Sequence, residues 1–200
     1  MNNAVLYEKK DGVATVTLNR PDRLNAVNDE IRAGLKEKLD DAAKDDEVKV
    51  IIVTGRDHKE ICNILKGFNV DIIHNQNYET GISSSISSGV EHLPKNSSST
   101  MICLADMPLL ASNDYNDIID FHQQNGGAST IVAPYRKKTT GNPVIFGKNY
   151  FKQLCCLNGD KGGKDILDKN SENLIKFNTK SEGFYFDIDN KNDFLKFKSL

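Results

Sequence analysis

One aspartate stands where an apolar stretch of the chain ends. Asp106 follows Met101–Ala105, a pattern that predicts a buried β-strand. Ligands of open α/β sheets bind beyond the carboxyl ends of the strands. Carboxylate oxygens, together with substrate phosphates, are the ligands that Mg²⁺ prefers. Asp106 is therefore a candidate metal ligand, and the alternative is an aspartate that caps the following turn.

Two more aspartates flank a single isoleucine near the carboxyl end of the chain. Asp187 and Asp189 close the run Phe184–Ile188, which we expect to be a strand, so that alternation places both carboxylates on one face. Two such carboxylates repel each other unless a cation or a hydrogen-bond donor lies between them. A metal ion satisfies this need. The alternative is a solvated pair in which Asp189 or Asn190 caps the next helix.

Three further segments combine glycine with polar side chains. Gly81 precedes Ser83, Ser84 and Ser85 at the expected start of a helix, where backbone N–H groups attract anions. Serines are also ordinary helix caps, so this segment alone is weak evidence. The segments Thr140–Pro143 and Gly159–Gly163 are turn sequences when each is taken alone.

The cysteines are typical of a protein that keeps its thiols reduced. Cys62, Cys103, Cys155 and Cys156 include no C-x-x-C pair, and this spacing does not fit a zinc site. Met1–Asp11 has no apolar stretch of the secretory type. We therefore expect reduced thiols and a cytoplasmic protein.

The elements that would position these residues alternate between strands and helices. A hairpin over Ala4–Arg20 precedes an amphipathic helix from Asn28 to about Lys44, in which Val27, Ile31, Leu35 and Leu39 recur every four residues. Beyond it the pattern predicts strands at 48–53, 71–74, 101–105, 129–134, 143–146, 174–178 and 184–188. The expected helices are 59–65, 83–93, 112–124, 151–157, 163–169 and 191–198. This alternation is typical of an α/β sandwich with a mainly parallel sheet.

The order of the motifs resembles one enzyme family. From about Val50 to Phe197 the chain is similar to the molybdenum-cofactor cytidylyltransferases, which are MobA-like NTP transferases. The segments that carry the resemblance are Ile51–Gly55, Ile73–Asn75 with Tyr78, Gly81–Ser85, Leu104–Leu109, Gly141–Pro143, Gly159–Gly162, and Asp187–Asp189 with Asp193-Phe194.

This resemblance implies a Rossmann-like nucleotidyltransferase fold, a three-layer sandwich, and transfer of a cytidylyl group from CTP to molybdopterin. It implies Mg²⁺ at Asp106 with help from Asp187 or Asp189, and catalytic roles for Asp106 and Asp189. Gly81, Ser83, Ser84 and Ser85 would lie by the nucleotide. The pterin substrate would lie by Gly141, Asn142, Pro143 and Asp160. CTP and GTP both stay open as the nucleotide.

One family motif is missing from these 200 residues. The family has a phosphate-binding loop of the form L-A-A-G-x-S-x-R-M-G, whose backbone N–H groups hold the triphosphate. We expect the hairpin and helix to replace the usual first strand and this loop. Residues 19–25 would take the loop's place, where a guanidinium of Arg20 or Arg23, with Arg23 as the candidate nucleotide-binding residue, would offer a bidentate contact to a phosphate. The alternative is two solvated arginines. Val13–Leu18 would then pair in parallel with 50–53.

Residues 1–56 resemble a different family, the crotonases (enoyl-CoA hydratases). The matching residues are Val16–Pro21 and Leu24–Ala26. The resemblance implies that the Ala26 N–H would supply half of an oxyanion hole. The Gly-Gly motif of the other half is absent after Gly55, and losing one donor lowers such rates about 100- to 1000-fold. Acyl-CoA hydratase or isomerase activity is therefore not expected.

Composition also changes near residue 56. All nine phenylalanines lie beyond it, and four of the five arginines lie before it or at it. We interpret the chain as one domain over 1–200, a chimera of a crotonase-like segment (1–56) and a nucleotidyltransferase-like body (50–200). A natural fusion, an engineered fusion and an assembly error all stay open, as does an inert scaffold. The net charge of −2 favours neither nucleic acid nor membrane, and we expect a monomer or weak oligomer.

Overall fold

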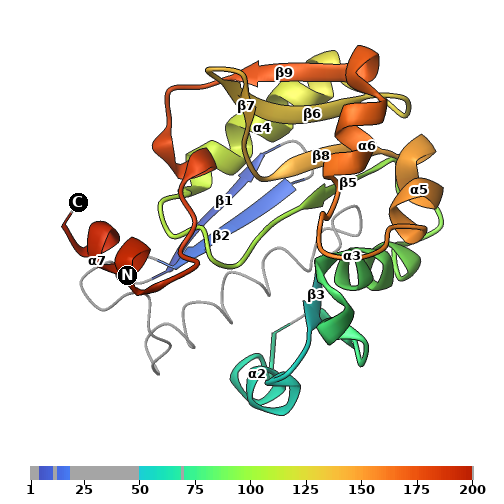
Figure 1. Ribbon diagram of the computed structural model, residues 1–200. Coiled ribbons are helices and arrows are strands. Elements are labelled where there is room, and N and C mark those ends of the chain that lie inside the picture. Colours follow the sequence, from blue (N-terminus) through green and yellow to red (C-terminus); the bar gives the residue numbers. More distant parts are fainter. Residues whose placement is uncertain (1–4, 11–12, 19–49, 69, 200) are drawn as a thin grey trace. The chain divides into compact units, whose positions relative to one another are not determined.

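The computed structural model describes residues 5–10, 13–18, 50–68 and 70–199 (Figure 1). The described residues form two compact units. The first contains those up to Ser97 together with Tyr150–Ser171, and the second contains Ser98–Asn149 together with the residues from Glu172 onward. The expected helix over 28–44, Ala26 and Arg23 lie outside the described residues. The expectation of a single domain over 1–200 stays a prediction.

The first unit begins with the expected hairpin. Strand β1 (Val5–Lys10) pairs antiparallel with β2 (Val13–Leu18), so that Val5 lies opposite Leu18 and Lys10 opposite Val13. The parallel pairing of Val13–Leu18 with 50–53 is not formed, because in the described residues β2 pairs only with β1. The hairpin leaves the second edge of β2 open, so it does not itself prevent that pairing. The parallel pair needs a long crossover, and its loss of chain entropy is larger than that of a hairpin closed over two residues.

A parallel pair of strands follows in the same unit. Strand β3 (Ile51–Thr54) runs alongside β4 (Asp71–His74), with Thr54 opposite His74. The connection contains helix α2 (His58–Ile64). This is the strand–helix–strand unit that the apolar run and the following polar helix predict.

Helix α3 (Ile82–Glu91) covers this pair. Gly89 allows a close approach, because a Cβ there would lie 3.1 Å from the Val53 side chain. The short helices η2 (Tyr78–Thr80) and α5 (Phe151–Cys155) pack against α3, and α6 (Lys164–Lys169) completes the described part of this unit.

The second unit is built on a five-stranded mixed sheet. Its path is β5 (Ser99–Ile102), β8 (Val144–Gly147), β6 (Ile131–Arg136) and β7 (Thr139–Thr140), and β9 (Leu174–Asn178) also pairs with β6. The β6–β9 ladder is parallel, and the others are antiparallel. Helix α4 (Ser112–Asn125) packs against β6 and β9 (Figure 1).

The core of the second unit lies between this sheet and α4. Ile118 of α4 and Ile131 of β6 are fully buried, and Phe146 and Phe184 are nearly so. Phe177 meets Phe184 edge to face at 5.7 Å between ring centroids. Such a geometry suits the charge distribution of aromatic rings. The consecutive apolar residues of β6 are typical of a strand covered on both faces.

The α/β class is confirmed, and the strands at 71–74 and 174–178 and the helix at 191–198, α7 (Lys191–Lys198), have the expected bounds. One expected strand is wrong. Residues 182–185 form the 3-10 helix η5 (Glu182–Tyr185), and 186–189 are irregular. The Ser181 hydroxyl accepts a hydrogen bond from the Gly183 N–H at 3.3 Å, which closes a tight turn in place of an extended strand.

Two smaller differences concern strand ends. Strand β5 stops at Ile102, not at Ala105, so Asp106 lies in the loop beyond the strand. The short strand β7 was not expected, because its two threonines leave no periodic pattern to detect. No described helix has the length and apolar character needed to cross a bilayer.

Gly183 provides a test of the packing around η5. A Cβ at Gly183 would lie 2.6 Å from the Leu109 carbonyl oxygen, whereas a Cβ at Gly127 would meet nothing within 4 Å. We expect Gly183→Ala to lower the free energy of unfolding by about 1–3 kcal/mol in urea denaturation, as overpacked sites do. Gly127→Ala is the control and should change it by less than about 1 kcal/mol. Equal effects of the two substitutions would contradict this account.

Candidate functional site

The second unit brings the three predicted metal ligands into one neighbourhood. The backbone N–H of Ile188 donates a hydrogen bond to the carbonyl of Asp106 at 3.0 Å. Asp187 and Asp189 flank that isoleucine, so both of their carboxylates lie near Asp106. Desolvation raises the pKa of Asp106, and repulsion from Asp187 and Asp189 raises it further, against the lowering effect of a backbone hydrogen bond.

The donor set fits a hard divalent cation. The carboxylates of Asp187 and Asp189 lie close enough to Asp106 to raise its pKa, and no ion pair to any of the three is found among the described residues. The three do not form a ready-made metal centre, because no group of three His, Cys, Asp or Glu side chains that could hold a metal ion occurs in the described ranges. Mg²⁺ commonly takes only one or two protein carboxylates and completes its shell with water and substrate phosphates. The site therefore fits a cation that is shared with a phosphate ligand.

The substrate-binding residues predicted in the second unit adjoin the same segment. The Asn142 N–H donates to the Phe184 carbonyl at 3.0 Å, and the Gly141 N–H donates to the Pro134 carbonyl at 2.9 Å. Gly141 lies so close to the Phe184 carbonyl that any side chain would collide with it. The Asn142–Pro143 peptide is cis. The loop over 141–143 is thus fixed to η5, a few residues before the acidic pair.

Two side chains near this loop, Arg136 of β6 and Tyr185 of η5, are not among the site residues predicted from the sequence. Arg136 makes a two-point ion pair with Glu182 at 2.6 and 2.8 Å, and its guanidinium lies 4.3 Å from the centre of the Tyr185 ring. The Tyr185 hydroxyl is buried without a hydrogen-bond partner. Its ring adjoins Gly141. A buried hydroxyl without a hydrogen-bond partner, next to a loop, is a group to which a polar ligand could hydrogen-bond.

The predicted nucleotide-binding serines lie in the first unit. The hydroxyls of Ser84 and Ser85 form hydrogen bonds with other groups of the chain. Asn75 donates from its amide to the hydroxyls of Ser84 and Ser85 at 2.8 and 3.0 Å. The Ser84 hydroxyl also bonds the carbonyls of Asn77 and Gly81. The Ser83 hydroxyl is fully buried and has no partner. Asn75 thus connects β4 to the start of α3, a role that the sequence motif does not predict.

The amino end of α3 is occupied by the chain itself. The Ile82 N–H donates to the Asp160 carboxylate at 3.2 Å, and the Ser83 N–H donates to the Gly159 carbonyl at 3.2 Å. Gly81 has a φ of +108°, and its backbone lies against Gly159. The expectation that serines cap this helix is wrong, since α3 has Gly81 as its N-cap and no side-chain cap of its own. Asp160, predicted to contact substrate, caps α3 here.

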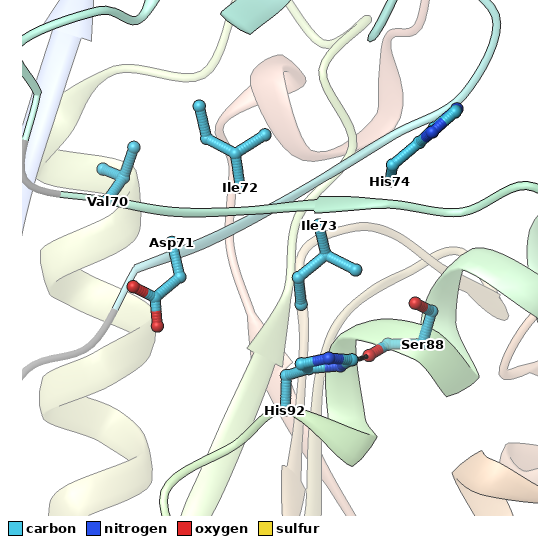
Figure 2. A pocket seen from close by; sticks show the side chains of 7 residues that line it. All are labelled: Val70, Asp71, Ile72, Ile73, His74, Ser88 and His92. Carbon is cyan, nitrogen blue, oxygen red and sulfur yellow. Dashed lines mark hydrogen bonds between the residues drawn. The ribbon is translucent and has the colours of Figure 1, made fainter.

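A cavity of about 600 Å³ opens beside β4 in the first unit. Figure 2 shows that Val70, Ile72 and His74 leave one side of the strand, and that Ser88 of α3 and His92, the residue that follows α3, lie on the other. The His92 ring bonds the Ser88 carbonyl at 2.7 Å. None of the site residues predicted from sequence lines this cavity.

The crowding of carboxylates has a measurable cost in stability. Because the folded protein raises the pKa of Asp106, the ionised form destabilises the fold. We expect Asp106→Asn to raise the free energy of unfolding at pH 7 by a few tenths to about 1 kcal/mol, a range reduced for solvent screening. This gain should vanish as the pH falls through the raised pKa to below about 3.9, where wild-type Asp106 is protonated in both states.

Asp193→Asn is the matched control for that experiment. Asp193 lies in the first turn of α7 and pairs with Lys196 at 3.1 Å. Replacing its carboxylate with the amide of asparagine should therefore lower the free energy of unfolding by a few tenths of a kcal/mol. Thermal unfolding followed from pH 3 to pH 8 measures both variants. A loss of stability in Asp106→Asn at pH 7 would refute the repulsion.

Solved structures resemble this fold at low sequence identity. Rv0371c of Mycobacterium tuberculosis H37Rv, solved in complex with manganese, is 19% identical with a TM-score of 0.62, covering 91% of this chain and 94% of that one. The molybdopterin-guanine dinucleotide biosynthesis protein A of Archaeoglobus fulgidus is 14% identical with a TM-score of 0.53, covering 74% of this chain and 76% of that one. At such identities these likenesses show a common fold.

A curated relative matches a much shorter stretch. The 1,2-epoxyphenylacetyl-CoA isomerase of Escherichia coli K12 is 44% identical over 55 residues, which is 28% of this chain and 21% of that enzyme. The chain thus spans about a fifth of the length of the curated relatives it matches.

A sequence profile covers far more of the chain. The profile of the MobA-like NTP transferase domain matches residues 35–174, well over half of the chain and including most of the motifs described above. The chain therefore belongs to the family of MobA-like NTP transferase domains.

Proposed function

We propose that this chain is a nucleotidyltransferase whose nearest activity is transfer of a cytidylyl group from CTP to molybdopterin, with release of pyrophosphate and at a strongly reduced rate. The family supports nucleotidyl transfer in general. The choice of CTP and molybdopterin rests on the motif order in the sequence. GTP is the alternative nucleotide.

One observation carries the proposal. A single segment, 182–189, bonds the loop of Asp106 through Ile188 and the loop of Asn142 through Phe184. It therefore holds the acidic residues next to the loop over 141–143, and its own Tyr185, whose ring adjoins Gly141, has a buried hydroxyl without a hydrogen-bond partner. A cation-dependent phosphate chemistry beside a polar substrate needs this combination. The similarly folded Rv0371c was solved in complex with manganese, which supports testing this chain for a divalent cation.

The residues of the chain would act mainly by positioning and electrostatics. Asp106, with Asp187 or Asp189, would hold Mg²⁺, which neutralises charge on the phosphates when bound. The loop over 141–143 would orient molybdopterin so that its phosphate can attack the α-phosphorus of CTP in line with the departing pyrophosphate. Binding of both substrates in this arrangement supplies most of the catalysis in such reactions.

The absence of the phosphate loop motif limits the reaction. A side-chain cation such as Arg23 replaces a nest of backbone donors poorly, and Pro21 removes one N–H from the same stretch. An inert scaffold that retains the fold is therefore the second candidate. The match to a CoA isomerase covers only 28% of this chain and 21% of that enzyme, so a crotonase-like origin of residues 1–56 stays a prediction from the sequence. The missing Gly-Gly motif argues against hydratase or isomerase activity.

Cation binding gives the first test. We expect Mn²⁺ to bind the wild-type chain in calorimetric titration, and Asp106→Ala to abolish this heat because it removes the central carboxylate. Asp193→Ala, whose carboxylate pairs with Lys196 outside the cluster, should bind Mn²⁺ like the wild type. Circular dichroism checks that the variants are folded. Retention of Mn²⁺ binding in folded Asp106→Ala would rule out the assignment.

Turnover gives the second test. With CTP, Mg²⁺ and molybdopterin, we expect pyrophosphate release at least about 100-fold slower than that of a family member with an intact phosphate loop, the effect typical of losing one essential set of donors. Titration of CTP with Mg²⁺ should show correspondingly weak binding. A rate comparable to the intact enzyme would show that residues 19–25 form a working phosphate site.

A further inference from the structure

Two asparagines of this chain, Asn125 and Asn158, stand directly before a glycine. Asparagine is one of the less durable side chains of proteins, because its amide can react with the backbone nitrogen of the next residue. A glycine in that next position favours the reaction, since it has no Cβ to keep its nitrogen away. Both asparagines are exposed, so exposure alone does not distinguish the two pairs.

The first pair is held by the end of a helix. Asn125 is the last residue of α4, and its side-chain amide donates to the Phe121 carbonyl at 2.9 Å. The Gly126 N–H donates to the His122 carbonyl at 2.6 Å. The Gly126 backbone also lies tightly against His122, because a Cβ on this glycine would overlap the imidazole ring. Both groups that would have to react are therefore engaged.

The second pair lies in a turn, outside any helix or strand. Asn158 lies shortly after α5, and its amide donates to the Cys156 carbonyl at 3.2 Å. In the part of the chain that the structure describes, the Gly159 N–H has no hydrogen-bond partner. Gly159 has a φ of +73°, and a Cβ on it would meet nothing within 4 Å. Neither hydrogen bonding nor packing therefore keeps the Gly159 nitrogen from the Asn158 side chain.

We propose that Asn158 is a site of spontaneous deamidation whose product releases the amino end of α3. The Gly159 nitrogen attacks Cγ of Asn158 and forms a new C–N bond. The amide nitrogen leaves as ammonia, taking the proton of the Gly159 N–H, and a cyclic succinimide remains. Water then opens this ring at either carbonyl. One product is an aspartyl residue, and the other is an isoaspartyl residue whose backbone is longer by one carbon.

The turn that changes also holds the start of α3. The Gly159 carbonyl accepts from the Ser83 N–H at 3.2 Å, and the Asp160 carboxylate accepts from the Ile82 N–H at 3.2 Å. Gly81 leaves no free space here, because a Cβ on it would lie 2.6 Å from the Gly159 carbonyl oxygen. An added backbone carbon at position 158 shifts Gly159 and Asp160, and the first amides of α3 lose their acceptors.

Peptide mass spectrometry of the full chain, kept at pH 8, measures deamidation at both pairs. We expect Asn158 to react at least about tenfold faster than Asn125, because the hydrogen bonds of both reacting groups must open in the Asn125 pair. In concentrated urea the two rates should become similar, because the local sequence alone then sets them. Equal rates in the folded chain, or a tenfold difference that persists in urea, would overturn the proposal.

Hydrogen exchange tests the effect on α3. In the isoaspartyl form, separated by chromatography, the Ile82 and Ser83 amides should exchange at least about fivefold faster than in fresh protein, as expected for the loss of one hydrogen bond each. The amides of α4 serve as the control and should not change. Unchanged exchange at Ile82 and Ser83 would refute the release of α3.

Two variants separate the longer backbone from the added charge. Asn158→Gln keeps an amide but cyclises far more slowly, so the same incubation should leave its α3 amides protected. Asn158→Asp adds the charge without the extra carbon, and a negative charge near a helix N-terminus is favourable, so its α3 amides should also stay protected. Fast exchange in either variant would show that the isoaspartyl backbone is not the cause.

Discussion

Two backbone hydrogen bonds and two glycines clasp the segment 182–189 between distant loops of the second unit. Phe184 accepts from Asn142, and Ile188 donates to Asp106. Gly183 and Gly141 permit the close approach, because a side chain at either would collide with a backbone carbonyl. Each hydrogen bond contributes only about 1 kcal/mol. The steric requirement is stricter, because a side chain at either glycine would have to displace a backbone carbonyl.

This clasp also explains why the acidic cluster can exist. Desolvation and mutual repulsion disfavour the ionised form of Asp106, so unconstrained loops would separate the three side chains. The core beneath, with Phe184 packed on Phe177, holds them in place. Binding sites commonly hold a few groups in an unfavourable arrangement, which the well-packed interior maintains and a ligand makes favourable.

Local patterns predicted most elements, since apolar runs such as Ile131–Pro134 and the cap at Asn190 leave clear signals in sequence. The family resemblance, not the local pattern, grouped Asp106 with Asp187 and Asp189, which do lie close enough to interact with it. The expected strand at 184–188, which was to place Asp187 and Asp189 on one face, is not formed. The sequence does not predict contacts between residues that lie far apart along the chain. Nothing near Ile82 indicates that its N–H bonds a carboxylate 78 residues away at Asp160. Likewise, the stacking of His58 on His74 follows only from strand register.

The two units are interleaved along the chain, with Tyr150–Ser171 returning to the first after the second has begun. A ribosome releases residues in order, so neither unit can be finished before the other is well advanced. Strand β9 and the clasp are synthesised after the strands and loops that they contact. Until they emerge, β6 lacks its parallel neighbour and Asp106 its two companions. The acidic cluster therefore forms only after residues on both sides of Tyr150–Ser171 have emerged, and no single cut of the chain isolates either unit intact.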